Sequence, residues 1–195
     1  AYFEEIGKKK FSEQAVAFLN AYWPEVGSQA EFIFSVSYEF IKKADMHAKG
    51  IQLIHKYEEG TDVDFDIGLY FYEKLCKFLE EDGKNWSKAP YEISQPEMMT
   101  ALKRKQELRD KVDVNFDGRI SFLEYLLYQY QGVANPADFV SRSMNQGEEH
   151  PELRAARLAL EEVAQAIREF EAEKYRLSEE AKQEAESLLQ DHQQQ

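Results

Sequence analysis

The chain has 195 residues, of which 43% are hydrophobic and 13% aromatic, so it can bury a sizeable core and is not intrinsically disordered. Its formal net charge of −13 disfavours nucleic acid and anionic membranes as primary partners and favours cations. The lone Cys76 excludes an internal disulfide, and no N-terminal apolar run of signal-peptide or membrane length is present, so we expect a cytoplasmic protein without membrane insertion.

Residues 1–57 predict an N-terminal helical region. The stretch FSEQAVAFLNAYW reads as a helix with Ser12 as its N-cap, and Pro24 ends it. The following stretch, QAEFIFSVSYEFIKKADMHAKGIQLIHKY, continues as one or two helices, and we expect Gly50 to be the break.

Residues 42–81 predict a degenerate EF-hand-like unit. A calcium-binding EF-hand loop of 12 residues needs oxygen ligands at positions 1, 3, 5 and 12, a carbonyl at 7 and glycine at 6. In the frame 56–67, KYEEGTDVDFDI, Val63 takes position 8, where such loops pair as short strands. Lys56 at position 1 and Ile67 at position 12 cannot serve as ligands. In this frame the unit is a silent partner that folds without calcium.

A second alignment of the same region to the loop motif predicts a metal site instead, and we keep it as the alternative. Over DVDFDIGLYFYE, residues 62–73, four acidic residues fall at ligand positions, while Ile67 takes the glycine position and a helix begins inside the loop. The four candidate ligands are Asp62, Asp64, Asp66 and Glu73. We favour the silent partner over this second ion site.

Residues 95–131 predict a complete EF-hand. Ser94 and Glu97 have capping-box spacing and open a helix that runs to Val112, and the loop DVNFDGRISFLE follows over 113–124. The candidate ligands are Asp113, Asn115, Asp117, the carbonyl of Arg119, Ser121 through a water, and Glu124. Because every ligand position is filled, we expect one Ca2+ ion, bound with an affinity of order micromolar.

The C-terminal part predicts a short helix over 136–145, capped by Asn135, and a long helix over 151–190. Along the long helix, one narrow apolar seam repeats in alternating steps of three and four. The seam consists of Leu153, Ala156, Leu160, Val163, Ile167, Phe170, Lys174 and Leu177. We expect it to dock on the EF-hand domain of the same chain through Leu153, Leu160, Val163, Ile167 and Phe170. A marginal coiled coil with a second copy is the alternative.

No catalytic constellation is visible in the sequence. The four histidines have no metal-ligand spacing among themselves, and the chain lacks a phosphate-binding P-loop, a nucleophile elbow and a dinucleotide fingerprint. The sequence therefore predicts a protein that is not an enzyme.

Several long stretches of the chain resemble the calcium-regulated actin-bundling protein family of social amoebae. They are AVAFLNAYWPEV, EGTDVDFDIGLYFYEKLCKF, ISQPEMMTALKRKQELRDKVDVNFDGRISFLEYLLYQY, ANPADF and HPELRAARLALEEV. The resemblance covers most of residues 13–175. It implies an all-α fold with an EF-hand-like pair, additional N-terminal helices and a long C-terminal amphipathic helix. It also implies cross-linking of F-actin in the cytoskeleton that calcium inhibits, with the ligands of the 113–124 loop as already given. Members of that family extend past the long helix.

An acidic protein needs local basic patches to bind acidic F-actin. The candidate patches are Lys8-Lys9-Lys10 and Lys103-Arg104-Lys105.

Two other functions stay open. A calcium sensor or buffer would bind a target helix in an apolar groove formed by Phe122, Leu126, Tyr128 and Tyr130. A structural EF-hand protein would belong to a microtubule or another cytoskeletal lattice.

Overall fold

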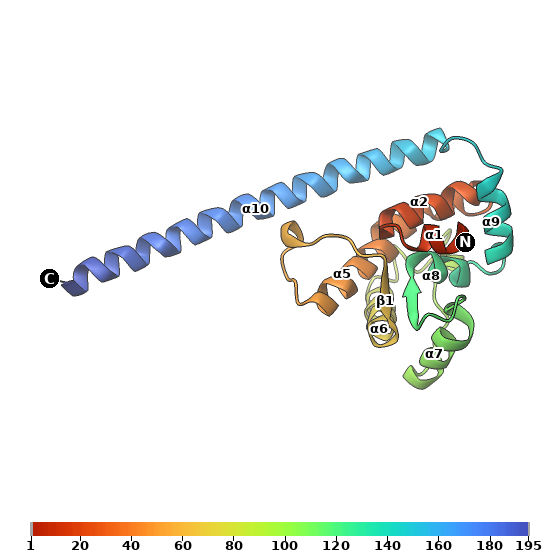
Figure 1. The fold of residues 1–195 in the computed structure, drawn as a ribbon, viewed down its shortest axis with the longest axis horizontal. Helices are drawn as coiled ribbons and strands as arrows, with labels where there is room; N and C mark the ends of the chain where they lie inside the picture. Colours follow the sequence, from red (N-terminus) through yellow and green to blue (C-terminus); the bar gives the residue numbers. More distant parts are fainter. Residues whose placement is uncertain (1, 195) are drawn as a thin grey trace.

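The computed structural model describes residues 2–194, which are mostly helical, with one sheet of two short strands (Figure 1). The α-helices are α1 (Tyr2–Gly7), α2 (Phe11–Ala21), α3 (Trp23–Val26), α4 (Ala30–Phe32), α5 (Tyr38–Lys49), α6 (Phe65–Glu81), α7 (Ala101–Glu107), α8 (Phe122–Gln129), α9 (Pro136–Met144) and α10 (Pro151–Gln194). Short 3-10 turns cover Gly27–Gln29, Ile54–Lys56 and Glu92–Ser94, and π-helical turns cover Ile33–Ser37 and Leu108–Val112. The strands are β1 (Asp62–Asp64) and β2 (Arg119–Ser121). The all-α class is confirmed.

The two EF-hand-like loops meet through the sheet. The 56–67 loop lies between α5 and α6, and the 113–124 loop lies between α7 with its π-helical turn and α8. Strands β1 and β2 pair antiparallel, and Val63 lies opposite Ile120. Ile120 is position 8 of its loop, so this register matches the frame in which Val63 is also position 8. Each loop thereby satisfies strand hydrogen bonds of the other.

The core under the sheet is built from aromatic side chains of α2, α6 and α8. Phe11, Phe18, Phe71, Phe122 and Tyr125 are each at most 2% exposed. The Phe71 and Tyr125 rings meet edge to face with centroids 5.0 Å apart, and Phe11 meets Phe122 in the same way at 6.2 Å. Each buried ring contributes roughly 1.5 to 3 kcal/mol to the free energy of unfolding. The 113–124 loop therefore leads into a helix that is firmly packed.

The start of α2 differs from the prediction. The helix begins at Phe11, so Lys10 occupies the N-cap position and Ser12 does not. The N–H and the hydroxyl of Ser12 donate to the carboxylate of Glu59 at 2.6 and 3.2 Å. The 56–67 loop therefore supplies, from outside the helix, the acceptor that an N-cap side chain would have supplied.

The predicted capping box at Ser94 is also wrong. The fully buried Ser94 hydroxyl donates to Oε1 of Gln29 at 2.6 Å and shares a hydrogen bond of 2.6 Å with the Tyr130 hydroxyl. Because these core partners occupy the hydroxyl, it caps no helix, and α7 starts later, with Thr100 as N-cap. By contrast, Gly50 ends α5 in a left-handed conformation (φ 67°), as predicted.

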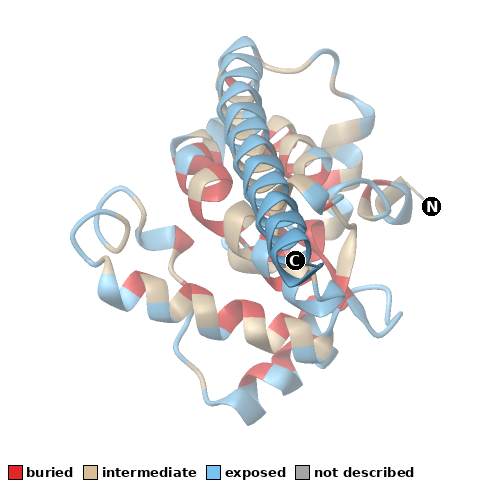
Figure 2. Cartoon of the chain, turned by 90° about the vertical axis from the view of Figure 1, so that its left-hand side faces the viewer, coloured by how far each residue is buried: buried red, intermediate tan, exposed pale blue. Residues whose placement is uncertain are grey.

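Helix α10 starts at Pro151, as predicted, but continues to Gln194 instead of ending near residue 190. It runs past α2 and then projects beyond the body of the molecule (Figure 1), and most of its surface is exposed (Figure 2). Neither α10 nor any other helix within residues 2–194 combines the length and apolar character needed to cross a membrane.

The predicted docking seam of α10 is only partly correct. Leu153 is fully buried and Leu160 packs against the core, but Val163, Ile167 and Phe170 are 57%, 56% and 72% exposed. The helix is rotated so that a neighbouring, more polar stripe faces the body. Val163 and Ile167 line an open pocket with Phe34 and Tyr38 instead of packing closely against the body, and Phe170 is largely exposed.

Candidate metal centre

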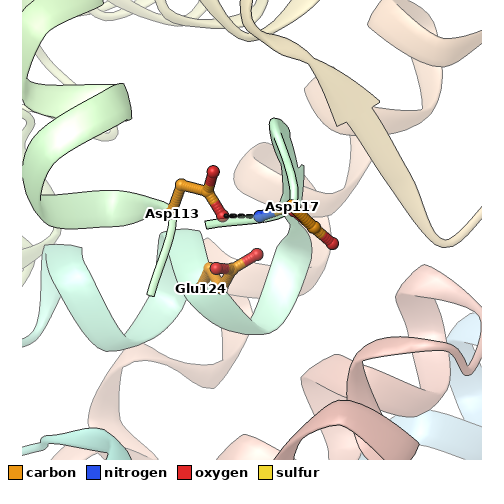
Figure 3. A group of neighbouring side chains, drawn as sticks. All are labelled: Asp113, Asp117 and Glu124. Atoms are coloured by element: carbon orange, nitrogen blue, oxygen red, sulfur yellow. Dashed lines mark hydrogen bonds between the residues drawn. The ribbon is translucent and has the colours of Figure 1, made fainter. Parts of the chain in front are cut away.

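Backbone conformation and Asp113 together shape the 113–124 loop. Gly118 has a φ of 77°, a left-handed conformation that glycine adopts without strain, and Phe116 has a φ of 54°. The Asp113 carboxylate accepts the N–H of Asp117 at 3.3 Å and the N–H of Gly118 at 2.9 Å. These bonds fold the loop around the carboxylate, so its oxygens point into the interior of the loop (Figure 3).

Three predicted ligands converge in the loop. Asp113, Asp117 and Glu124 each offer one oxygen, and these oxygens all lie within 4.8 Å of one another (Figure 3). Glu124 is held in place by hydrogen bonds: its carboxylate accepts the N–H of Val114 at 2.6 Å and the N–H of Ser121 at 3.0 Å. Ser121 in turn caps the N–H of Glu124 at 3.1 Å, which completes a capping box at the start of α8.

Burial makes negative charge unfavourable at this site. It raises the pKa of Glu124 to about 7, although the N–H groups of Ser121 and Val114 act in the opposite direction. Burial also raises the pKa of Asp113, and the nearby Asp117 adds to this effect. A divalent cation among the three carboxylates would offset both the burial and the mutual repulsion.

Asn115 lies next to two of these carboxylates. With its NH2 group turned toward them, it would donate to Asp113 at 3.0 Å and to Asp117 at 3.2 Å. With the amide turned the other way, its oxygen would face the same place and could serve as a ligand. The donor set of carboxylates, an amide oxygen and the carbonyl of Arg119 consists of hard oxygen ligands, which suit Ca2+.

The second candidate site is not assembled. Asp62 accepts from Nε of Arg119 at 2.5 Å, and Asp64 caps the start of α6. Asp66 and Glu73 are exposed. Among residues 2–194, the metal-type side chains found gathered are those of the 113–124 loop. The geometry thus agrees with a silent 56–67 loop.

The basic cluster on α7 does not form a positive patch. Arg104 is 5% exposed, and its guanidinium lies 4.0 Å from the centre of the Tyr72 ring. Lys103 pairs with Glu107 at 3.2 Å, and Lys105 lies 3.5 Å from Asp66 of α6. Arg104 is therefore buried, while Lys103 and Lys105 stay exposed to solvent beside carboxylates.

The other basic cluster is open to solvent. Lys8, Lys9 and Lys10 are all exposed on the connection between α1 and α2. Lys8, together with Glu4, lines a pocket of about 290 Å³ that opens onto the 113–124 loop. Lys8 therefore lies beside the candidate metal centre.

Helix α10 binds the backbone of the turn that leads into the 56–67 loop. The guanidinium of Arg168 donates to the carbonyls of Ile54 at 2.6 Å, Tyr57 at 3.1 Å and His55 at 3.2 Å. Glu171 accepts the backbone N–H of His55 at 2.8 Å and contacts its ring Nδ1 at 2.6 Å. A continuous path of contacts therefore joins α10 to the sheet and, through it, to the 113–124 loop.

Comparison with known proteins gives two strong similarities. The chain is 66% identical, over 182 residues, to a calcium-regulated actin-bundling protein of Dictyostelium discoideum; the match covers 93% of this chain and 61% of that relative. It also matches the crystal structure of the 34 kDa F-actin bundling protein from the same organism with a TM-score of 0.80 and 66% identity. That match covers 93% of this chain and 70% of the solved one. No family model matches the chain.

Proposed function

We propose that this chain, which belongs to the family of calcium-regulated actin-bundling proteins, binds F-actin and that calcium at the 113–124 loop inhibits filament cross-linking. The observation that carries the proposal is the convergence of Asp113, Asp117 and Glu124 in a complete EF-hand loop. The 56–67 loop serves as a partner that binds no ion. The chain spans 61% of the length of its actin-bundling relative, so filament binding and bundling are separate questions.

The path of contacts from the 113–124 loop to α10 runs through the sheet. Calcium would bind Glu124 and Asp113 and change the loop between them and the adjoining β2, while the first turn of α8 stays in place. Strand β2 pairs with β1, and the turn before β1 carries the contacts of Arg168 and Glu171. We propose that the calcium state biases how firmly α10 is held against the body. Calcium can shift this equilibrium only by its difference in affinity for the two states.

The filament-facing basic patch is best assigned to Lys8, Lys9 and Lys10, because these residues are exposed. The 103–105 cluster is a weaker candidate, because Arg104 is buried and the exposed Lys103 and Lys105 lie beside carboxylates. With F-actin as partner, the protein would reside in the cytoplasm, on the cytoskeleton. No enzymatic activity is proposed.

The calcium-sensor alternative is less well supported, because its groove is not available. Phe122, Leu126 and Tyr130 are at most 3% exposed and form part of the core, and Tyr128 donates to Glu107 at 2.7 Å. A target helix could bind there only if the core opened. The lattice-protein alternative does not require this groove. Co-sedimentation with microtubules distinguishes it from the actin-binding function.

Co-sedimentation with F-actin, and with microtubules beside it, tests the proposal. High-speed pelleting measures binding and low-speed pelleting measures bundling, each with calcium and with EGTA. We expect F-actin binding that calcium weakens in the wild type and not in Glu124→Gln. Binding to microtubules instead of F-actin would favour the lattice protein. Unchanged calcium sensitivity in Glu124→Gln would place the regulation outside the 113–124 loop.

A further inference from the structure

The side chain of Gln14 joins three segments that are distant in the sequence. Gln14 lies on α2 and is fully buried. Its NH2 group donates to the carbonyl of Lys9 at 2.7 Å and to that of Thr61 at 2.8 Å, and its Oε1 accepts the N–H of Leu123 at 2.7 Å. Thr61 belongs to one EF-hand-like loop and Leu123 to the other. One amide therefore bonds both loops and the connection between α1 and α2.

The bond to Leu123 completes the start of α8. The first N–H groups of a helix have no partner within the helix. Ser121 accepts the N–H of Glu124, and Gln14 accepts the N–H of Leu123, one residue earlier. With both bonds made, the first turn of α8 is fixed, and with it the backbone that carries the Glu124 carboxylate.

Only an amide side chain satisfies these partners. Glutamine offers two donors and one acceptor, and all three are used at Gln14. A carboxylate would lack the donors. An apolar side chain of equal length would leave two carbonyls and one N–H without partners in a buried place. The polar residue on the buried face of α2 is therefore explained by its hydrogen bonds and not by packing.

We infer that Gln14 is a positioning residue for calcium. It holds the first turn of α8 so that Glu124 stays where its carboxylate can reach the ion together with Asp113. The inference rests on the proposed calcium binding at the 113–124 loop. A site that is already in its binding geometry binds more tightly because less ordering accompanies binding. Loss of Gln14 therefore weakens calcium binding about tenfold, mainly by faster dissociation.

The test compares Gln14→Met with the matched variant Gln29→Met. Gln29 is 1% exposed, donates to the carbonyl of Pro90 at 2.8 Å and accepts the Ser94 hydroxyl at 2.6 Å, all outside the 113–124 loop. Isothermal titration gives the calcium affinity, and thermal unfolding in EGTA gives the loss of stability. We expect both variants to lose stability and only Gln14→Met to lose calcium affinity.

Calcium binding measured on the wild type distinguishes failure of this inference from failure of the proposed function. If wild-type protein binds no calcium at the 113–124 loop, the proposed function is wrong and the inference falls with it. If the wild type binds calcium and Gln14→Met binds it as tightly as Gln29→Met does, the positioning role alone is refuted.

A measurement on wild-type protein covers the case in which Gln14→Met does not fold. In NMR spectra, the side-chain amide of Gln14 should shift during a calcium titration. Its midpoint should match that of the 113–124 loop amides, and the side chain of Gln29 should not shift. A Gln14 signal that stays in place while the loop amides move would overturn the inference.

Discussion

Replacing Arg168 by Met should release α10 from the turn that precedes the 56–67 loop. The guanidinium donates to three backbone carbonyls, those of Ile54, His55 and Tyr57. Methionine keeps much of the aliphatic volume of arginine but has no donor. The substitution therefore removes the hydrogen bonds and leaves most of the packing unchanged.

The expected size of the effect follows from the surroundings of the three bonds. They are only partly buried, so water can replace part of what the guanidinium provides. The low end for one bond to a charged donor is about 1.5 kcal/mol, so three bonds give about 4.5 kcal/mol. If water replaces roughly half of this, about 2 kcal/mol remains, or about a 30-fold larger population of the detached state. Leu153 stays buried and keeps the beginning of α10 attached, so detachment is local.

Hydrogen exchange of the His55 amide measures this detachment, because its N–H donates to Glu171 at 2.8 Å. We expect exchange up to about 30-fold faster in Arg168→Met. Arg176→Met is the control: Arg176 pairs only within α10, with Glu173 at 2.5 Å among its partners, so His55 should exchange at the wild-type rate. Equal His55 exchange in the wild type and in Arg168→Met would refute the idea that the guanidinium holds α10.

Three further substitutions test other parts of the structure. Glu124→Gln should weaken calcium binding by about 30-fold or more while the protein stays folded, because a charged ligand becomes neutral; titration calorimetry measures this, and unchanged affinity would place the ion elsewhere. The hydrogen bond from Tyr128 is the main reason why the pKa of Glu107 is lowered to about 2. Glu107 therefore stabilises the fold fully above about pH 4.5, and this contribution is lost as the pH falls toward 2. Urea unfolding should show a stability difference from Glu107→Gln that shrinks over that range; a constant difference would contradict the assignment. Gly60→Ala would place a Cβ 2.5 Å from Oδ2 of the buried Asp45, which should cost about 1 to 3 kcal/mol of unfolding free energy in a thermal melt; an unchanged melting temperature would show that the carboxylate can move aside.

The 113–124 loop was predictable from the sequence because its ligands are fixed by local spacing. Each ligand sits at a set position in one loop, so no distant residue is needed to place it. Helix starts were less predictable, because a capping side chain can be engaged elsewhere. Ser94 has the spacing of a capping box, but its hydroxyl bonds Gln29 and Tyr130 in the core. The sequence pattern contains no information about those partners.

The docking of α10 was predicted only in part, for a related reason. Leu153 and Leu160 of its apolar seam contact the core, but further along the helix the hydrogen bonds come from Arg168 and Glu171, whose partners include backbone groups of a distant turn. Backbone acceptors have no side-chain signature in a sequence. Gln14 did carry a signal, since it is a polar residue in the apolar stripe of Phe11 and Phe18. That signal marks a buried polar group, but only the structure identifies its partners.

Because α10 is long, a small rotation at its docked part produces a large displacement at its far end. At 1.5 Å per residue, the helix runs about 39 Å from Arg168 to Gln194. A swing of about 20° at the docked end would carry the far end through roughly 13 Å. A rearrangement of a few hydrogen bonds at one turn would thus become a displacement larger than the diameter of a helix, and any filament attached near the far end would be moved or released by it.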